Sequence, residues 1–251
     1  MIGTPPVPEP GLVTPDWPLP PGVRAASTTR LGGVSVGPYQ GLNLGDHVGD
    51  DPRAVAANRA ALARALGLPA APAWLTQVHG SAVAGPDDPP GCRADARYAD
   101  RPAVVCAVLT ADCLPLLLCS ADGREVAAVH CGWRGLAGGI VGAAVARFSA
   151  APAALRAWLG PAIGPAAFEV GDEVRACFVQ ADPDAAACFV ATRPGHWLAD
   201  LAALTRRALA GAGVRQVYGS GACTATDAAR FYSYRRDGVT GRMASLIWRE
   251  R

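Results

Sequence analysis

Apolar runs that stop at a histidine or a cysteine dominate the hydrophobic pattern of this chain. The clearest run, Val126-Ala127-Ala128-Val129, is β-prone and lacks regular alternation, which is typical of a strand buried on both faces. It ends at His130, and residues 136–148 then carry apolar or small side chains on nearly every side, which predicts a helix buried all round. We therefore expect His130 at a strand-to-helix junction, where Gly132 and Gly135 let the backbone turn tightly or approach a ligand.

Two apolar runs before this strand predict a hairpin. Residues 103–109 predict a buried strand, and the run over 110–119 follows it. Ser120-Ala121-Asp122-Gly123, which carries an Asp-Gly turn signal, would join this second run to the strand that ends at His130. If these four residues form the loop, Cys113 faces His130 with Cβ atoms roughly 5 Å apart. A thiolate and an imidazole at that distance can share one metal or one proton. Pro115 weakens the register argument, since proline favours strand edges and bulges.

The remaining pattern predicts short strands, loops and a few helices. Asp51 and Pro52 predict the start of a helix that runs through Leu62 and stops at Gly67. Residues 74–79 predict a strand that again ends on a His-Gly pair. The other elements that we expect are strands over 25–29, 217–218 and 242–248, a strand ending near 160, helices over 172–179 and 197–210, and an irregular lead-in over 1–22 anchored by Trp17.

Composition predicts a globular protein and excludes some chemistry. The chain has 251 residues, 51% of them hydrophobic, and a net charge of +2 without a basic stripe, so we expect no nucleic-acid partner. All 23 basic residues are arginine, which excludes Schiff-base chemistry and a Walker-type phosphate lysine. Any bound anion must be held by arginine or by backbone N–H groups.

The sequence carries no signal peptide and no apolar run of membrane length, so a cytoplasmic protein without a membrane partner is expected. Eight cysteines without paired short spacings do not resemble a secreted disulfide framework. Four of them lie in apolar runs and are predicted to be small buried hydrophobic residues: Cys106, Cys119, Cys177 and Cys188.

Three residues at strand ends are candidate metal ligands: His79, Cys113 and His130. Two neutral imidazoles and one thiolate make a three-ligand zinc site with a fourth position open for water or substrate, and copper accepts the same ligands. The alternatives are two hydrogen-bonded core histidines with a buried thiol, or a metal-free Cys–His nucleophilic pair. A G-x-S-x-G match at 33–37 is followed by Pro38 and Gly41 rather than a helix, so Ser35 is predicted to be a loop residue.

Four motifs carry a family resemblance: Thr76-Gln77-Val78-His79-Gly80, Ala111-Asp112-Cys113, Val129-His130-Cys131-Gly132-Trp133-Arg134-Gly135 and Phe231-Tyr232-Ser233-Tyr234-Arg235-Arg236-Asp237. Together they resemble the YfiH family, also called the laccase-domain or multicopper polyphenol oxidoreductase family. The resemblance covers almost the whole chain, from Arg30 to the last strand. Cys131 departs from the alanine usual in the family.

The resemblance implies a single α+β domain, spanning 1–251, with four layers in the order α/β/β/α. It also implies a zinc held by His79, Cys113 and His130, which would be the catalytic residues. The implied reactions are phosphorolysis of adenosine, inosine and methylthioadenosine, and deamination of adenosine at the same site. The family is also linked to copper-dependent oxidation of polyphenols and to an amidase that corrects peptidoglycan precursors; a non-catalytic metal-binding module is a further alternative.

The residues favour some of these alternatives over others. A four-copper laccase needs about ten histidine ligands, whereas this chain has four histidines, so laccase activity is disfavoured. Phosphorolysis needs a phosphate site beside the metal, for which Arg30 and Arg235 are the candidates, although an exposed pair such as Arg235-Arg236 is often only a solvated turn. We expect small-molecule partners, a purine nucleoside and phosphate, contacted by Arg30, Asn43, Gln77 and Arg235, in a monomer or homodimer.

Overall fold

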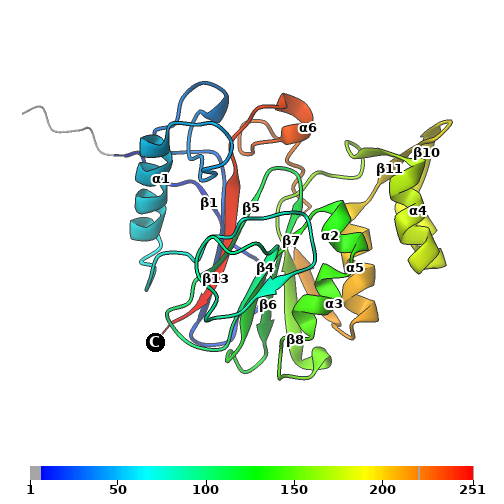
Figure 1. The fold of residues 1–251 in the computed structure, drawn as a ribbon, viewed down its shortest axis with the longest axis horizontal. Coiled ribbons are helices and arrows are strands. Elements are labelled where there is room, and N and C mark those ends of the chain that lie inside the picture. Colours follow the sequence, from blue (N-terminus) through cyan, green and yellow to red (C-terminus); the bar gives the residue numbers. More distant parts are fainter. Residues whose placement is uncertain (1–6, 220, 251) are drawn as a thin grey trace, which may run out of the picture.

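The computed structural model, which describes residues 7–219 and 221–250, consists of two β-sheets packed face to face with helices on both outer sides (Figure 1). Helix α1 covers one sheet, and α2, α3 and α5 cover the other (Figure 1). This arrangement confirms the predicted α+β class and its four layers. None of the helices in these ranges is long and apolar enough to cross a membrane.

The first sheet is antiparallel and has the strand order β1-β2-β13-β5. Its strands are β1 (Leu12–Val13), β2 (Val23–Thr28), β13 (Met243–Arg249) and β5 (Cys106–Thr110). Helix α1 (Pro52–Ala65) begins as predicted, because the Asp51 side chain accepts a hydrogen bond from the N–H of Arg53. Its Leu62 packs with Leu42, Leu44 and Leu246 into a core between helix and sheet.

The second sheet is mixed and has the strand order β12-β8-β6-β7-β4-β3. Its strands are β12 (Gln216–Gly219), β8 (Leu155–Leu159), β6 (Leu114–Ser120), β7 (Val126–Cys131), β4 (Ala96–Ala99) and β3 (Val83–Ala84). Strands β6 and β7 are buried along their whole length, since one face meets the first sheet and the other meets the helices. Burial on both faces explains their unalternating apolar sequences. The predicted anchor Trp17 is buried between the two sheets.

The hairpin of β6 and β7 forms, but its predicted register was wrong. His130 pairs with Pro115 rather than with Cys113. The reason is the turn: the N–H of Ser120 donates to the carbonyl of Glu125, and the Ser120 hydroxyl accepts from the N–H of Glu125, so the loop comprises residues 121–124. Moving the loop by one residue moves every pairing by two positions, and the alternation of faces is preserved.

Three predicted elements differ from the structure. The helix expected over 136–148 is two helices, α2 (Trp133–Ala137) and α3 (Ile140–Val145), because the chain turns at Gly139, whose φ is 83°. The strand expected over 74–79 is an extended loop with one bridge between Thr76 and Arg93. Trp197 lies in β11 (His196–Ala199), and α5 (Leu201–Gly211) begins only after it.

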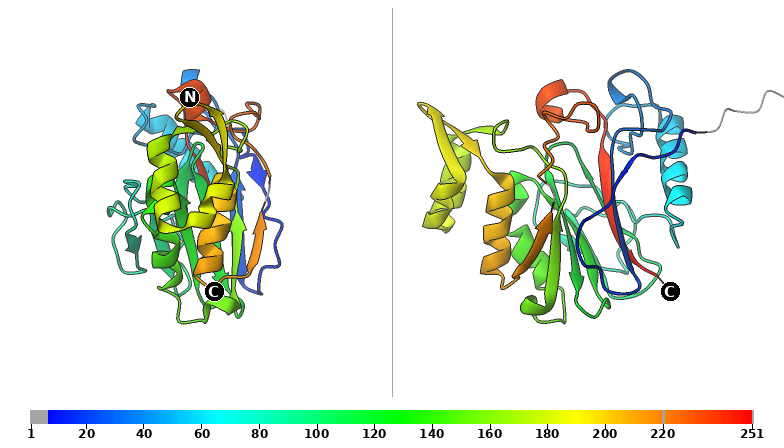
Figure 2. Two further views of the ribbon diagram at one scale, coloured as in Figure 1. Left: turned by 90° about the vertical axis from the view of Figure 1, so that its right-hand side faces the viewer. Right: turned by 180° about the vertical axis from the view of Figure 1, so that it is seen from behind.

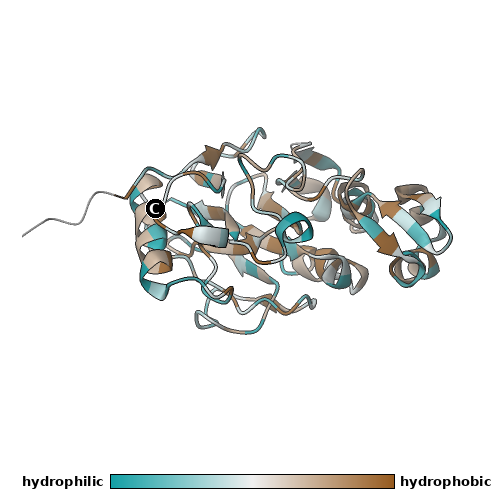
Figure 3. Cartoon of the chain, turned by 90° about the horizontal axis from the view of Figure 1, so that it is seen from above, coloured by the Kyte–Doolittle hydropathy of each residue, from teal (hydrophilic) through white to brown (hydrophobic). Residues whose placement is uncertain are grey.

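A small sheet and one helix form an arm at one end of the body (Figure 2). The arm contains β9 (Glu169–Gly171), α4 (Asp172–Ala181), β10 (Phe189–Arg193) and β11, in the strand order β10-β11-β9. Its Cys177 is exposed, so the prediction that this cysteine is buried was wrong, whereas Cys106, Cys119 and Cys188 are buried as expected. Hydrophobic segments run among the central strands in Figure 3.

Short elements complete the described chain: η1 (Gly37–Tyr39), η2 (Pro152–Ala154), η3 (Pro183–Cys188) and α6 (Tyr234–Asp237). Ser35 lies in a loop, as predicted. Its hydroxyl donates to Asp50 and accepts from the Asn58 amide, so it is bound within a structural network rather than placed beside a catalytic base.

Candidate metal centre

The structure brings His79, Cys113 and His130 together. One ligand atom of each residue lies within 4.8 Å of the others. Cys113 Sγ lies 3.9 Å from His79 Nε2, and the two imidazole rings meet edge to face with their centroids 4.8 Å apart. The three side chains come from the end of β7, from the residue before β6 and from the loop after Thr76.

Cys113 is positioned by a strained residue next to it. Asp112 has a φ of 88°, in the left-handed region that is unfavourable for most residues. Its carboxylate accepts hydrogen bonds from Thr224 Oγ1 at 2.6 Å, Ser233 Oγ at 3.0 Å and the N–H of Arg235 at 2.7 Å. These three bonds hold the turn that points the thiol away from the hairpin and toward the histidines.

Asp95, which the sequence analysis missed, organises both histidines. Its carboxylate accepts from the N–H groups of Val78, His79 and Gly80 at 3.1, 2.9 and 2.7 Å, and it bonds His130 Nδ1 at 2.8 Å. His79 has a φ of 59°, and these bonds support that conformation. Because Nδ1 of His130 faces a carboxylate, its proton resides there and Nε2 is left to bind a metal.

Glycines provide the space in which the three ligands meet. A Cβ at Gly132 would lie 2.8 Å from His79 Cδ2 and 3.1 Å from Cys113 Sγ. A Cβ at Gly135 would lie 2.7 Å from the carbonyl oxygen of Gly80. The glycines after β7 therefore permit close approach between the start of α2 and the loop that carries His79.

Opposite charges in the trio shift two pKa values. Burial opposes ionisation of Cys113, but His130, with hydrogen bonds from both histidines, lowers the pKa of the thiol to about 6. Burial likewise opposes protonation of His130, but Cys113 and Asp95 raise the pKa of its imidazole to about 9. Without a metal, the site therefore holds a thiolate and an imidazolium near neutral pH.

The donor set fits a divalent metal of intermediate softness. A thiolate and two imidazole nitrogens are ligands that zinc and copper accept, and three protein ligands leave one coordination position open. The Asp95–His130 bond supplies the supporting contact that metal-binding histidines usually have. The arrangement is therefore a candidate metal-binding site.

The structure places Gln77 and Asn43 in structural contacts. Gln77 donates from Nε2 to the carbonyl of Leu109 at 2.9 Å and accepts from the N–H of Leu109 at 2.7 Å, which fixes the end of β5. Asn43 is fully buried and holds the backbone of Gly45 and the N–H of Arg242. Their predicted roles in substrate binding stay predictions.

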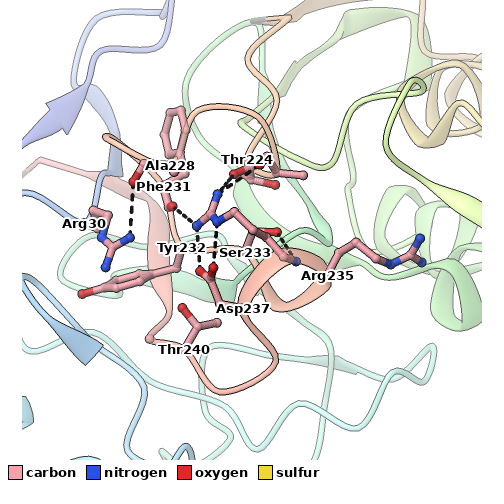
Figure 4. Close-up of polar contacts among 12 residues, drawn as sticks. Arg30, Thr224, Ala228, Phe231, Tyr232, Ser233, Arg235, Asp237 and Thr240 are labelled. Atoms are coloured by element: carbon pink, nitrogen blue, oxygen red, sulfur yellow. Dashed lines mark hydrogen bonds and ion pairs between the residues drawn. The ribbon is translucent and has the colours of Figure 1, made fainter. Parts of the chain in front are cut away.

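Arg30 and Arg235 extend in different directions (Figure 4). The Arg30 guanidinium lies 4.7 Å from the centroid of the Tyr232 ring and donates to the carbonyl of Ala228 at 3.3 Å. Arg235 is exposed and donates to the carbonyl of Glu169 at 2.9 Å, at the base of the arm. The two cations do not converge on one anion in this arrangement.

Known proteins resemble this chain in both sequence and fold. A family model described as multi-copper polyphenol oxidoreductase laccase matches residues 24–250. A purine nucleoside phosphorylase of Shigella flexneri, there called YfiH, is 53% identical over 239 residues, which is 94% of this chain and 98% of that protein. A purine nucleoside phosphorylase of Haemophilus influenzae is 46% identical over 241 residues, with coverage of 95% and 99%.

Solved structures agree with these sequence matches. The Neisseria meningitidis protein NMB0706 has a TM-score of 0.91 and 48% identity, with coverage of 96% of this chain and 100% of that chain. YlmD from Geobacillus stearothermophilus has a TM-score of 0.89 and 35% identity, with coverage of 96% and 97%. A two-sheet α+β domain with a His-Cys-His cluster thus defines the class of protein. The chain belongs to the YfiH, or laccase-domain, family.

Metal binding is expected to release about one proton between roughly pH 6 and 9. Cys113 is already ionised above about pH 6, whereas His130 keeps a proton below about pH 9 that it must lose to bind through Nε2. Calorimetric titration with Zn²⁺ in buffers of different ionisation enthalpy gives the number of protons released. Affinity should fall about tenfold per pH unit below about pH 9 and more steeply below about pH 6, where the Cys113 proton must also leave. Tight binding without proton release at neutral pH would contradict this assignment.

Asp95→Asn is expected to weaken metal binding roughly 10- to 100-fold, because the amide no longer fixes the His130 tautomer as a carboxylate does. Competition with a chromophoric chelator measures the affinity, and the melting temperature reports on the fold. Asp184→Asn is the matched control, since Asp184 is an exposed carboxylate in the arm whose ion-pair partner is Arg207. Equal weakening in both variants would show that Asp95 has no specific role at the metal.

Proposed function

We propose that this protein is a zinc-dependent purine nucleoside phosphorylase that also deaminates adenosine at the same site. The observation that carries the proposal is the convergence of His79, Cys113 and His130 in a chain about half identical, over nearly its whole length, to proteins named purine nucleoside phosphorylase. Inorganic phosphate and a purine nucleoside are the proposed substrates.

The proposed metal is zinc, with copper as the alternative, held by His79, Cys113 Sγ and His130 Nε2. When bound, it would supply a Lewis acid at the open position, which suits an oxyanion or a water molecule. The chain's own residues contribute orientation and charge. Asp95 holds the His130 ring and the backbone of His79, and the bonds to Asp112 hold the turn that carries the thiol, so protein groups support all three donor residues.

Two observations favour this chemistry over a multicopper oxidase. Within residues 7–219 and 221–250, His79, Cys113 and His130 form the only cluster of at least three potential ligand side chains. A four-copper centre needs about ten histidines, and the whole chain has four. The three candidate ligands therefore indicate the type of reaction better than the multi-copper description of the family does.

Cys113→Ala is expected to abolish both reactions while the fold persists, because the side chain is proposed to be a ligand rather than core packing. The free energy of unfolding should fall by no more than roughly 1–2 kcal/mol if the metal contributes little to folding. Purine release from inosine, with and without phosphate, and inosine formation from adenosine measure the two activities. Cys177→Ala, which changes an exposed thiol in the arm, is the control and should keep both. Full activity in Cys113→Ala would refute the proposed site.

Arg30→Ala is expected to slow phosphorolysis selectively if Arg30 contacts phosphate. Loss of one charge-assisted contact corresponds to a roughly 10- to 150-fold effect, while deamination of adenosine persists. The contacts of Arg30 with Ala228 and Tyr232 define the alternative, in which it only supports a loop. Parallel assays of adenine and inosine formation, with the melting temperature, distinguish the two. Equal loss of both products together with thermal stability would assign Arg30 to the loop.

A further inference from the structure

Arg242 is an arginine that the fold places near the candidate metal centre. It immediately precedes β13, whose first residue Met243 pairs with Thr110 at the end of β5. The antiparallel register therefore places Arg242 next to Ala111, and Asp112 and Cys113 follow directly along the chain. Two segments far apart in sequence thus present an arginine and a metal-ligand thiol at the same end of one sheet.

The backbone and the stem of Arg242 are fixed. Its N–H donates to Asn43 Oδ1 at 2.8 Å, and its carbonyl accepts from the N–H of Leu44 at 3.1 Å. The stem packs over Gly45, where a Cβ would lie 2.8 Å from Arg242 Cγ. Gly45 is therefore required for this side chain to lie against the loop that carries His47.

Only one nitrogen of the Arg242 guanidinium donates hydrogen bonds to the residues that the structure describes. Nη1 donates to the carbonyls of Thr240 at 2.9 Å and Gly241 at 3.0 Å. Within the described part of the chain, Nε and Nη2 donate to no acceptor, and no carboxylate lies within ion-pair distance of the half-buried head. Arg59, near the same loop, differs: it pairs with Asp46 at 3.2 Å and lies over the ring of Trp74.

Charged groups around Arg242 shift its own pKa, and its charge shifts the pKa of His47. Burial lowers the pKa of Arg242, and the Cys113 thiolate and the Asp112 carboxylate oppose that effect. Desolvation and the Arg242 charge together lower the pKa of His47, although Asp46 acts in the opposite direction. A half-buried cation without a carboxylate partner is stabilised by an anion that binds to it.

The loop against which Arg242 packs also lines a cavity. A cavity of about 440 Å³ is bounded by His47, Arg59, Trp74 and Gln77, and Gln77 is two residues from His79. Ligand sites for small molecules have volumes in this range. The His47 loop, against which Arg242 packs, thus forms one wall of the cavity, and the segment leading to His79 forms another.

We propose that Arg242 binds the inorganic phosphate substrate beside the metal centre, with Nε and Nη2 donating to two phosphate oxygens. This inference rests on the proposed function and deepens it, because it assigns a further residue, in addition to the candidate Arg30, to recognition of the second substrate. The paired N–H groups of a guanidinium match two oxygens of one phosphate, which a lysine ammonium cannot reproduce.

The test measures phosphate binding to the zinc-loaded protein by calorimetry at constant ionic strength. Arg242→Met keeps much of the apolar stem and should weaken binding roughly 10- to 100-fold, and Arg242→Lys should recover part of that loss. Arg124→Met, at an exposed position in the β6–β7 loop, is the matched control and should bind phosphate like the wild type. Zinc content and melting temperature should be similar in all variants.

Steady-state kinetics separate recognition of phosphate from a general loss of structure. Arg242→Met should raise KM for phosphate by a similar factor and leave KM for inosine within about twofold. Weakened phosphate binding in this variant supports the assignment even if the wild-type protein cleaves no nucleoside, in which case only the proposed function fails. Phosphorolysis by the wild type, with equal phosphate affinity in the wild type and in Arg242→Met, overturns the assignment and leaves the proposed function intact.

A labelling experiment on the wild-type protein covers the case in which the variants do not fold. Phenylglyoxal modifies arginine, and mass spectrometry follows Arg242 and Arg124 separately. Saturating phosphate should slow modification of Arg242 at least about fivefold relative to chloride at equal ionic strength, with no change at Arg124. An unchanged rate at Arg242 overturns the assignment.

Discussion

The candidate centre depends most on the carboxylate of Asp95. It bonds the His130 ring and three consecutive N–H groups around His79, so one buried anion sets the orientation of both imidazoles. Its own backbone carbonyl also accepts from the N–H of His130 at 2.7 Å. Without these bonds, nothing would fix the orientation of His79, a loop residue with positive φ, relative to His130 in β7. The charges of Cys113 and Asp95 also favour protonation of His130, so a metal that bound through Nε2 would have to displace a proton.

The sequence predicted those parts of the fold that local pattern determines. The cap at Asp51, the buried strands on both sides of the β6–β7 turn, and the glycines after His130 follow from side-chain size and polarity over a few residues. Local pattern did not determine the register, because Asp122 accepts from Ser120 Oγ and from the N–H of Arg124 and thereby selects a loop one residue further along. Such turn geometry depends on side-chain bonds that an Asp-Gly signal alone does not specify.

The trio was predictable as a set of residue types at strand ends, whereas its supporting residues were not. Asp95 lies between Ala94 and Ala96, and nothing in that context distinguishes it from a surface aspartate. Its partners come from residues 78–80 and from residue 130, which only the sheet order β7-β4-β3 brings together. The same limit applies to Arg242, whose position beside Cys113 results from the pairing of β13 with β5, far apart in sequence.

Cys131 and His130 are neighbours in sequence, but their side chains lie on opposite faces of β7. Alternation along β7 directs Cys131 into the core beneath α2 and α3, where it is fully buried, while His130 faces the other ligands. Burial, with the negative charges of Cys113 and Asp95, raises the pKa of the Cys131 thiol well above its usual range. Cys131 therefore remains a neutral thiol. The same negative charges that favour an imidazolium at His130 disfavour a second thiolate, so the electrostatics of the site favour Cys113 over Cys131 as the ionised sulfur.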